Sequence, residues 1–583
     1  MSAKVDSILR KRLSFTFGAG RVPTLVALAF VVLFLIFETA YFWSTTGIEV
    51  DRIAFEYDGF SQAIYAAYLA AALYLFFLYI LATIASRWRF RLVYLAIFAF
   101  ALLVEYSYQF ALGRFTTYYD LIAAISATGE QKADSISAFV SYIWLVPFLV
   151  LVAVCFAVGK RLQKFGWKML AMLFVMTLAF YLHLSFVNPA FFDGRFTSSS
   201  FGMFWTSVSD FAVRNPIQLS PITRETVEAP ANANVPNNNV IFIFDESIRA
   251  DHMSLNGYER PTTTYLDELQ RKHQLVNWGT ASSASTSSHP SYDAFIAGAT
   301  PEQIETLSLR QLNSMPTIFQ YAKAMNYKTT LIDGQMMKYW GGAPDDLNYI
   351  DEFDSLAVID NPDRKEDYQT ASNKITDEAL RTNGLKQWEI DTKIAERVNK
   401  IFTSSTGNFI FIYKRGCHFP YEKNYPENEE HWKPVYHFHE QYEIPPADKV
   451  GAIINSYDNS LSYNLDDFFK TLSKDYSDLP NNTIIVYTGD HGESFFANGK
   501  AGHGGETKGE AAVPLFILGM KDRTVDTGFK ASHANMFTTL LDLMNYPEEL
   551  RKYPYAISLF KAKAADSRPR YFNPSLEKRV PFD

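Results

Sequence analysis

The sequence predicts a membrane-anchored α/β protein, in which an N-terminal bundle of five transmembrane helices is followed by a domain with a mostly parallel sheet flanked by helices. Five long apolar runs precede Asn188. Short apolar runs that alternate with helical patterns follow it, which is typical of α/β domains. At 583 residues the chain is too long for one compact domain. Its hydrophobic residues, 48% of the total, are concentrated in the N-terminal part.

Each long apolar run can cross a bilayer, which takes roughly 20 residues in a helix. The predicted spans are Val22–Trp43, Gln62–Ala85, Leu92–Leu112, Phe139–Val158 and Met169–Phe186. The first run is too long, and too weakly followed by small residues, for a cleaved signal peptide, so we expect it to remain as an anchor.

Basic residues in the short flanking segments predict the orientation, because Lys and Arg are retained in the cytoplasm. They lie before the first span, between the second and third, and between the fourth and fifth: Lys4, Arg10, Lys11, Arg12, Arg21, Arg87, Arg89, Arg91, Lys160, Arg161, Lys164 and Lys168. We therefore expect a multi-pass protein with a cytoplasmic N-terminus and a C-terminal domain outside the cytoplasm.

The charge and the cysteine content argue against nucleic acid as a partner and against a cysteine-based site. The net charge of -8 and the lack of a basic stripe beyond the membrane flanks predict that nucleic acid is not a partner. The two cysteines, Cys155 in an apolar run and Cys417 in the C-terminal part, predict neither a disulfide between them nor a cysteine-rich metal site.

The chain divides into four predicted parts: the membrane domain 1–187, a bridging segment and linker 188–239, a catalytic domain 240–563 and a tail 564–583. The linker is rich in Pro, Asn and Ala without periodicity. Short runs that are apolar on both faces predict buried parallel strands: Val240–Phe244, Thr329–Ile332, Phe409–Tyr413, Ile484–Tyr487 and Leu515–Leu518.

Polar residues follow three of these strands. Glu246 follows the first, His418 comes shortly after the third, and Asp490 and His491 follow the fourth, with His503 further on. Because ligands gather beyond the carboxyl ends of parallel strands, we expect these side chains to converge. Oxygen and nitrogen ligands without thiolates are typical of a catalytic zinc site.

A Ser/Thr-rich tract precedes a predicted helix at Tyr292–Ala297. Hydroxyls at a helix start face free N–H groups and the positive end of the helix dipole, which favours a phosphorylated side chain. A plain Ser/Thr-rich loop is the alternative.

Several motifs together resemble the membrane-anchored phosphoethanolamine transferases of the alkaline phosphatase and sulfatase superfamily, which include enzymes that modify lipid A. The longest is Glu246-Ser-Ile-Arg-Ala-Asp-His-Met-Ser-Leu-Asn-Gly-Tyr258. The others are His418-Phe-Pro-Tyr421, Tyr457-Asp-Asn-Ser460, Asp490-His-Gly-Glu-Ser494 and Ser532-His-Ala-Asn-Met-Phe537.

The resemblance implies a sulfatase-like catalytic domain that binds one zinc ion, or two. By the resemblance, Glu246, Asp490 and His491 bind zinc together with the nucleophile. His418 and His503 lie opposite, where they assist proton transfer or hold a second zinc ion.

The nucleophile is assigned by register. Family members usually carry threonine in a Thr-x-x-Ser setting, and an ungapped register from Asn277 and Trp278 predicts Ser288 as nucleophile and metal ligand. Ser288-His-Pro-Ser291 is also similar to the Ser/Cys-x-Pro-Ser core of sulfatases. Another register predicts Ser285 or Thr286.

Three departures bear on the substrate. Tyr292 stands where sulfatases carry the arginine of their formylglycine signature, which disfavours sulfate ester hydrolysis. In Leu331-Ile-Asp-Gly-Gln-Met-Met-Lys338, Gly334 replaces an expected Asn, while Gln335 and Lys338 are predicted to contact the donor. The disulfides common in the lipid A enzymes are absent, which suggests a divergent branch with another acceptor.

The resemblance implies transfer of phosphoethanolamine from phosphatidylethanolamine to lipid A, lipooligosaccharide or another envelope glycan, through a phosphorylated Ser288. The predicted place is the inner membrane of a bacterium, with the catalytic domain in the periplasm. One alternative is a phosphoglycerol transferase or phosphodiesterase with the same metal site. Another is a catalytically silent membrane sensor or interaction protein.

Overall fold

The computed structural model describes residues 29, 32–40, 70–80, 88–112, 115–116, 121, 167–187, 199–217, 224–231, 233–307, 309–334, 354–358, 386–438, 446–473, 479–497, 502–520, 524–574 and 579–583. These residues fall into two compact units, one that contains most of the N-terminal helical part and one that consists mainly of the domain from Arg214 onward.

The N-terminal unit contains three named helices: α5 (Trp88–Leu112), α9 (Trp167–Val187) and α10 (Ser200–Ile217). Within the described residues, one helix is long and apolar enough to cross a membrane, α5 along Trp88–Gln109, with a mean hydropathy of 1.7. α5 and α9 contain the third and fifth predicted spans. The first two spans are described only in part and the fourth lies outside the described residues, so the five-helix bundle stays a prediction.

The second unit is built on a seven-stranded sheet with the strand order β2-β7-β6-β1-β5-β3-β4. The strands are β1 (Asn239–Asp245), β2 (Leu275–Ser282), β3 (Lys328–Asp333), β4 (Ser355–Val358), β5 (Asn408–Lys414), β6 (Thr483–Gly489) and β7 (Ala512–Leu518). β7 is antiparallel to both of its neighbours, and the other described pairings are parallel. The predicted mostly parallel sheet is confirmed.

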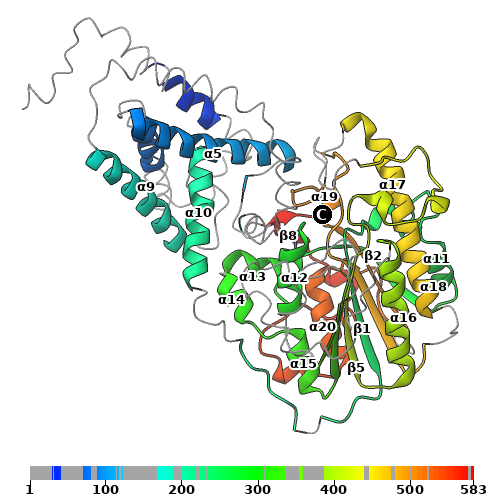
Figure 1. The fold of residues 1–583 in the computed structure, drawn as a ribbon. Coiled ribbons are helices and arrows are strands. Elements are labelled where there is room, and N and C mark those ends of the chain that lie inside the picture. The colour runs from blue at the N-terminus through cyan, green and yellow to red at the C-terminus, as the bar shows by residue number, and fades with distance from the viewer. Residues whose placement is uncertain are drawn as a thin grey trace, which may run out of the picture. The chain divides into compact units, whose positions relative to one another are not determined.

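The central strands are apolar on both sides because helices cover both faces of the sheet (Figure 1). In β1, Val240, Phe242 and Phe244 pack into one core cluster, and Ile241 and Ile243 pack into the other. Helices of the first face are α12 (Ser288–Ala297), α15 (Ile318–Ala324) and α20 (His533–Leu543); those of the second are α11 (Thr264–Arg271), α16 (Glu389–Ser404), α17 (Val450–Ser462) and α18 (Phe468–Ser473). Shorter helices are α13 (Pro301–Thr306), α14 (Leu309–Ser314) and α19 (Lys508–Ala511).

Three features differ from the pattern expected along the chain. The Ser/Thr-rich tract begins inside a strand, because β2 extends to Ser282. The helical pattern over Ile453–Leu472 corresponds to two helices, α17 and α18, which are joined by a π-helical turn over Tyr463–Asp467. Beyond residue 564, the strands β8 (Tyr571–Phe572) and β9 (Val580–Pro581) form a small antiparallel pair, with Phe572 and Phe582 packed against Ala511 and Ala512.

Candidate active site

The site lies beyond the carboxyl ends of three adjacent strands, β5, β1 and β6. Glu246 follows β1, and Asp490 and His491 follow β6. The two strand ends are tied together, because the Asp490 N–H donates to the Asp245 carbonyl at 2.8 Å and the Ser247 N–H donates to Asp490 Oδ1 at 2.8 Å. The residues that follow β1 and β6 therefore lie next to each other.

Ser288 is the first residue of α12 and points into this group. Its Oγ lies 3.0 Å from His491 Nε2 and 3.2 and 3.3 Å from the two carboxylate oxygens of Glu246. α12 is held against the sheet by Phe295, whose ring stacks on Phe242 with the centroids 4.5 Å apart. A buried hydroxyl is thus fixed at a helix N-terminus beside a carboxylate and an imidazole.

The other two candidate hydroxyls make different contacts. Thr286 Oγ1 donates to the Gly505 carbonyl at 2.7 Å. Ser285 Oγ is buried and has no hydrogen-bond partner among the described residues. Of the three hydroxyls, Ser288 is the one that the structure describes in contact with Glu246 and His491.

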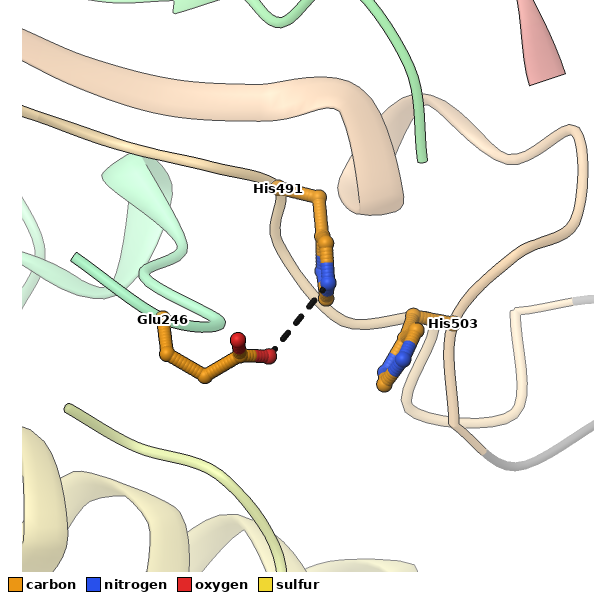
Figure 2. A group of neighbouring side chains, drawn as sticks. All are labelled: Glu246, His491 and His503. Atoms are coloured by element: carbon orange, nitrogen blue, oxygen red, sulfur yellow. Dashed lines mark ion pairs between the residues drawn. The ribbon is translucent and has the colours of Figure 1, made fainter. Parts of the chain in front are cut away.

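Glu246, His491 and His503 form a group suited to a metal ion (Figure 2). One ligand atom from each lies within 4.8 Å of the others. The His491 Nδ1–H donates to the Gly492 carbonyl at 2.8 Å, which leaves the Nε2 lone pair directed at the site. His491 Nε2 lies 3.5 Å from Glu246 Oε1 and 3.6 Å from Asp490 Oδ2. Carboxylate oxygens and imidazole nitrogens in this arrangement fit zinc.

Buried like charges also favour a cation here. Burial and the nearby Glu246 charge raise the pKa of Asp490 well above its ordinary value. Burial opposes ionisation of Glu246 as well, but His491, His418 and His503 together lower the pKa of that carboxyl. Burial, with the nearby His503, lowers the pKa of His491 to about 4, so this imidazole is neutral at neutral pH, as a metal ligand must be.

His418 lies at the margin of the group. Its Nδ1 is 2.6 Å from the Phe419 carbonyl, to which it donates. Burial and the Arg415 guanidinium lower the pKa of His418 to about 3. His418 is not among the three residues with closely grouped ligand atoms, and its predicted role stays a prediction.

Glu493 has no role in the sequence interpretation, although it lies inside the Asp490–Ser494 motif. Its Oε1 is 3.4 Å from His503 Nδ1. Burial alone would lower the pKa of His503, but the carboxylates of Glu493, Glu246 and Glu510 together raise it, with Glu493 contributing most among them. Glu493 therefore orients His503 and favours its protonated form.

Tyr413 is the second site residue that the motifs do not indicate. The sequence pattern predicts only a buried strand there, yet the Tyr413 hydroxyl lies 3.2 Å from Glu246 Oε2 and 3.2 Å from Asp490 Oδ2.

Gln335 and Lys338, the predicted donor contacts, lie outside the described residues. The preceding Gly334 is described, and its N–H donates to the Tyr413 carbonyl at 2.8 Å. A Cβ at Gly334 would come within 2.8 Å of the Ile394 side chain and 3.2 Å of the Tyr413 carbonyl oxygen. This crowding is a physical reason for glycine where the resembling family has asparagine.

The chain is similar in sequence to a known protein family and to known transferases. A family model described as Sulfatase matches residues 238–546. The Kdo(2)-lipid A phosphoethanolamine 7''-transferase of Escherichia coli is 25% identical over 300 residues, which cover 51% of this chain and 46% of that protein. The phosphatidylethanolamine transferase Mcr-1 of Escherichia coli is 26% identical over 335 residues, covering 52% of this chain and 53% of that protein. The chain thus spans about half the length of the curated relatives it matches.

A solved structure shares the fold. The integral membrane protein lipooligosaccharide phosphoethanolamine transferase A (EptA) from Neisseria meningitidis is 17% identical, with a TM-score of 0.56. The alignment covers 93% of this chain and 99% of that chain.

Proposed function

The chain belongs to the sulfatase family, and we propose that it transfers phosphoethanolamine from phosphatidylethanolamine to lipid A, lipooligosaccharide or another envelope glycan. The observation that carries the proposal is the contact of the Ser288 hydroxyl with Glu246 and His491 at the start of α12. The transferred group is supported by the names of the curated relatives, which are phosphoethanolamine and phosphatidylethanolamine transferases.

Glu246, Asp490, His491 and Ser288 would hold one zinc ion, and His418 and His503 are the candidates for a second. When bound, zinc supplies a Lewis acid that acidifies a hydroxyl and stabilises negative charge on phosphoryl oxygens. The oxygen and nitrogen donors of the group, the neutral His491 and the adjacent buried carboxylates support this choice of metal.

The residues of the chain divide the reaction into two transfers. The deprotonated Ser288 oxygen forms a bond to phosphorus as the bond to the diacylglycerol oxygen breaks, and protonated His503 gives that oxygen a proton. The free N–H groups at the start of α12 favour the phosphorylated Ser288. Neutral His503 then takes the proton of the acceptor hydroxyl, whose oxygen attacks phosphorus and releases Ser288.

A membrane location suits the reaction, because the proposed donor is a lipid and two of the proposed acceptors, lipid A and lipooligosaccharide, are glycolipids. We propose five spans within residues 1–187, a bridging segment 188–239, a periplasmic catalytic domain 240–563 and a tail 564–583, in the inner membrane with the N-terminus in the cytoplasm. The apolar helix α5 and the basic flanks of the spans support this arrangement.

The nucleophile is tested by mass spectrometry of the intact protein purified from membranes that contain phosphatidylethanolamine. We expect a phosphoethanolamine adduct on Ser288 that Ser288→Ala abolishes and that Ser285→Ala and Thr286→Ala retain. An adduct that survives Ser288→Ala would assign the nucleophile elsewhere.

The transferred group is tested on envelope glycolipids from cells with and without the protein. A phosphoethanolamine increment that depends on the protein is expected. A phosphoglycerol increment would favour the other transferase, and no change in any glycolipid, together with a zinc-free purified protein, would favour a sensor.

A further inference from the structure

Tyr413 is the residue before the last in β5, the strand next to β1, and is completely buried. Its backbone pairs in register with Phe244, and the two rings stack with centroids 6.0 Å apart. Its carbonyl accepts the Gly334 N–H at 2.8 Å. Backbone and ring are therefore both held, and the phenol oxygen has a fixed position at the floor of the site.

That oxygen lies between the two carboxylates that are proposed to hold zinc, 3.2 Å from Glu246 Oε2 and 3.2 Å from Asp490 Oδ2. Glu246 Oε2 is also the oxygen that Ser288 Oγ contacts at 3.2 Å. One tyrosine hydroxyl thus touches both acidic residues and shares an acceptor with the proposed nucleophile.

The remaining contacts show why this hydroxyl matters. Asp490 Oδ1 is held by two backbone N–H groups, those of Ser247 at 2.8 Å and His491 at 2.7 Å. For Asp490 Oδ2, the corresponding donor is the Tyr413 hydroxyl. Donors that hold a ligating carboxylate orient it toward the metal. Removal of such a donor commonly lowers metal affinity by roughly 10- to 100-fold.

We propose that Tyr413 is a positioning residue, whose phenol hydroxyl bridges Glu246 and Asp490 and holds both carboxylates in the geometry that binds zinc. This inference rests on the proposed zinc site. It assigns to a strand residue a function that neither the strand pattern nor the quoted motifs indicate.

The test compares the zinc affinity of the full-length wild-type protein with that of the Tyr413→Phe variant. Both affinities are measured in detergent by competition with a chromophoric chelator. Tyr413→Phe removes only the oxygen and keeps the ring against Phe244, so we expect the metal-free variant to unfold at the temperature of the wild type. Its zinc affinity is expected to fall about 10- to 100-fold.

Tyr487→Phe is the matched control. Tyr487 is equally buried and lies in β6, two residues before its end. Its hydroxyl donates to the Asp245 carboxylate at 2.6 Å, but Asp245 is not a proposed ligand. We expect its zinc affinity to equal that of the wild type.

Two results would overturn the inference. One is wild-type affinity in Tyr413→Phe. The other is an equal loss in both variants, which would indicate a general effect of buried hydroxyls. A wild-type protein that binds no zinc would refute the proposed zinc site itself. That failure is distinguishable from a failure of the Tyr413 inference, because it is seen in the wild-type protein alone.

Discussion

Asp293 is a buried carboxyl on the helix that Ser288 begins. Burial raises its pKa from 3.8 to about 7, against a smaller lowering by the nearby Arg224 guanidinium. Between these values the folded protein holds a proton that the unfolded chain has released. The free energy of unfolding therefore falls as the pH rises from 3.8 to about 7, and the loss is complete above that range.

Asp293→Asn should remove this dependence, because an amide does not titrate. At pH 8 the variant should be more stable than the wild type, by an amount on the order of a few kcal/mol. Thermal unfolding at a series of pH values measures the effect, with the exposed Asp448→Asn as control. An unchanged slope in Asp293→Asn would show that Asp293 titrates normally.

The position of α12 depends on how the helix ends. Gly298 follows its last residue with a φ of +67°, and its N–H donates to the Phe295 carbonyl at 3.0 Å. A Cβ at this position would lie 2.6 Å from the Phe537 ring of α20. Glycine therefore allows both the left-handed backbone and the close packing of α12 on α20.

Gly298→Ala should lower stability twice over, by roughly 1–3 kcal/mol for the backbone conformation and by roughly 1–3 kcal/mol for overpacking against Phe537. Gly257→Ala separates the two effects, because Gly257 has a φ of +91° but no atom within 4 Å of an added Cβ. Denaturant unfolding should show a larger loss for Gly298→Ala. Equal losses would mean that Phe537 moves aside at no cost.

The basic flanks of the predicted spans predict the orientation of the whole chain, with Lys11 in the cytoplasm and the C-terminal domain outside it. A cysteine at exposed Asp448 should react with a membrane-impermeant maleimide in intact spheroplasts, whereas Lys11→Cys should react only after permeabilisation. The natural Cys417 is buried. Labelling of both introduced cysteines in intact spheroplasts would contradict an odd number of spans.

The sequence by itself determined the α/β class, the central strands and the identity of the strand-end residues Glu246, Asp490 and His491. The reason is local, because strands covered on both faces are continuously apolar and parallel strands deliver their ends to one edge of the sheet. The motifs also indicated the alkaline phosphatase and sulfatase superfamily, and the Sulfatase family model matches residues 238–546. The weaker strands β2 and β4 and the reversed direction of β7 carry no comparable local signal.

Only the tertiary structure decided which side chains meet. Ser285, Thr286 and Ser288 are chemically similar along the chain, and the packing of α12 directs Ser288 at Glu246 and His491. Its role as nucleophile stays a prediction. By its sequence pattern Tyr413 is a core strand residue. The register of the sheet places its hydroxyl between Glu246 and Asp490, which follow two other strands. Hydrogen bonds between residues so distant in sequence depend on the folded backbone, and no local pattern encodes them.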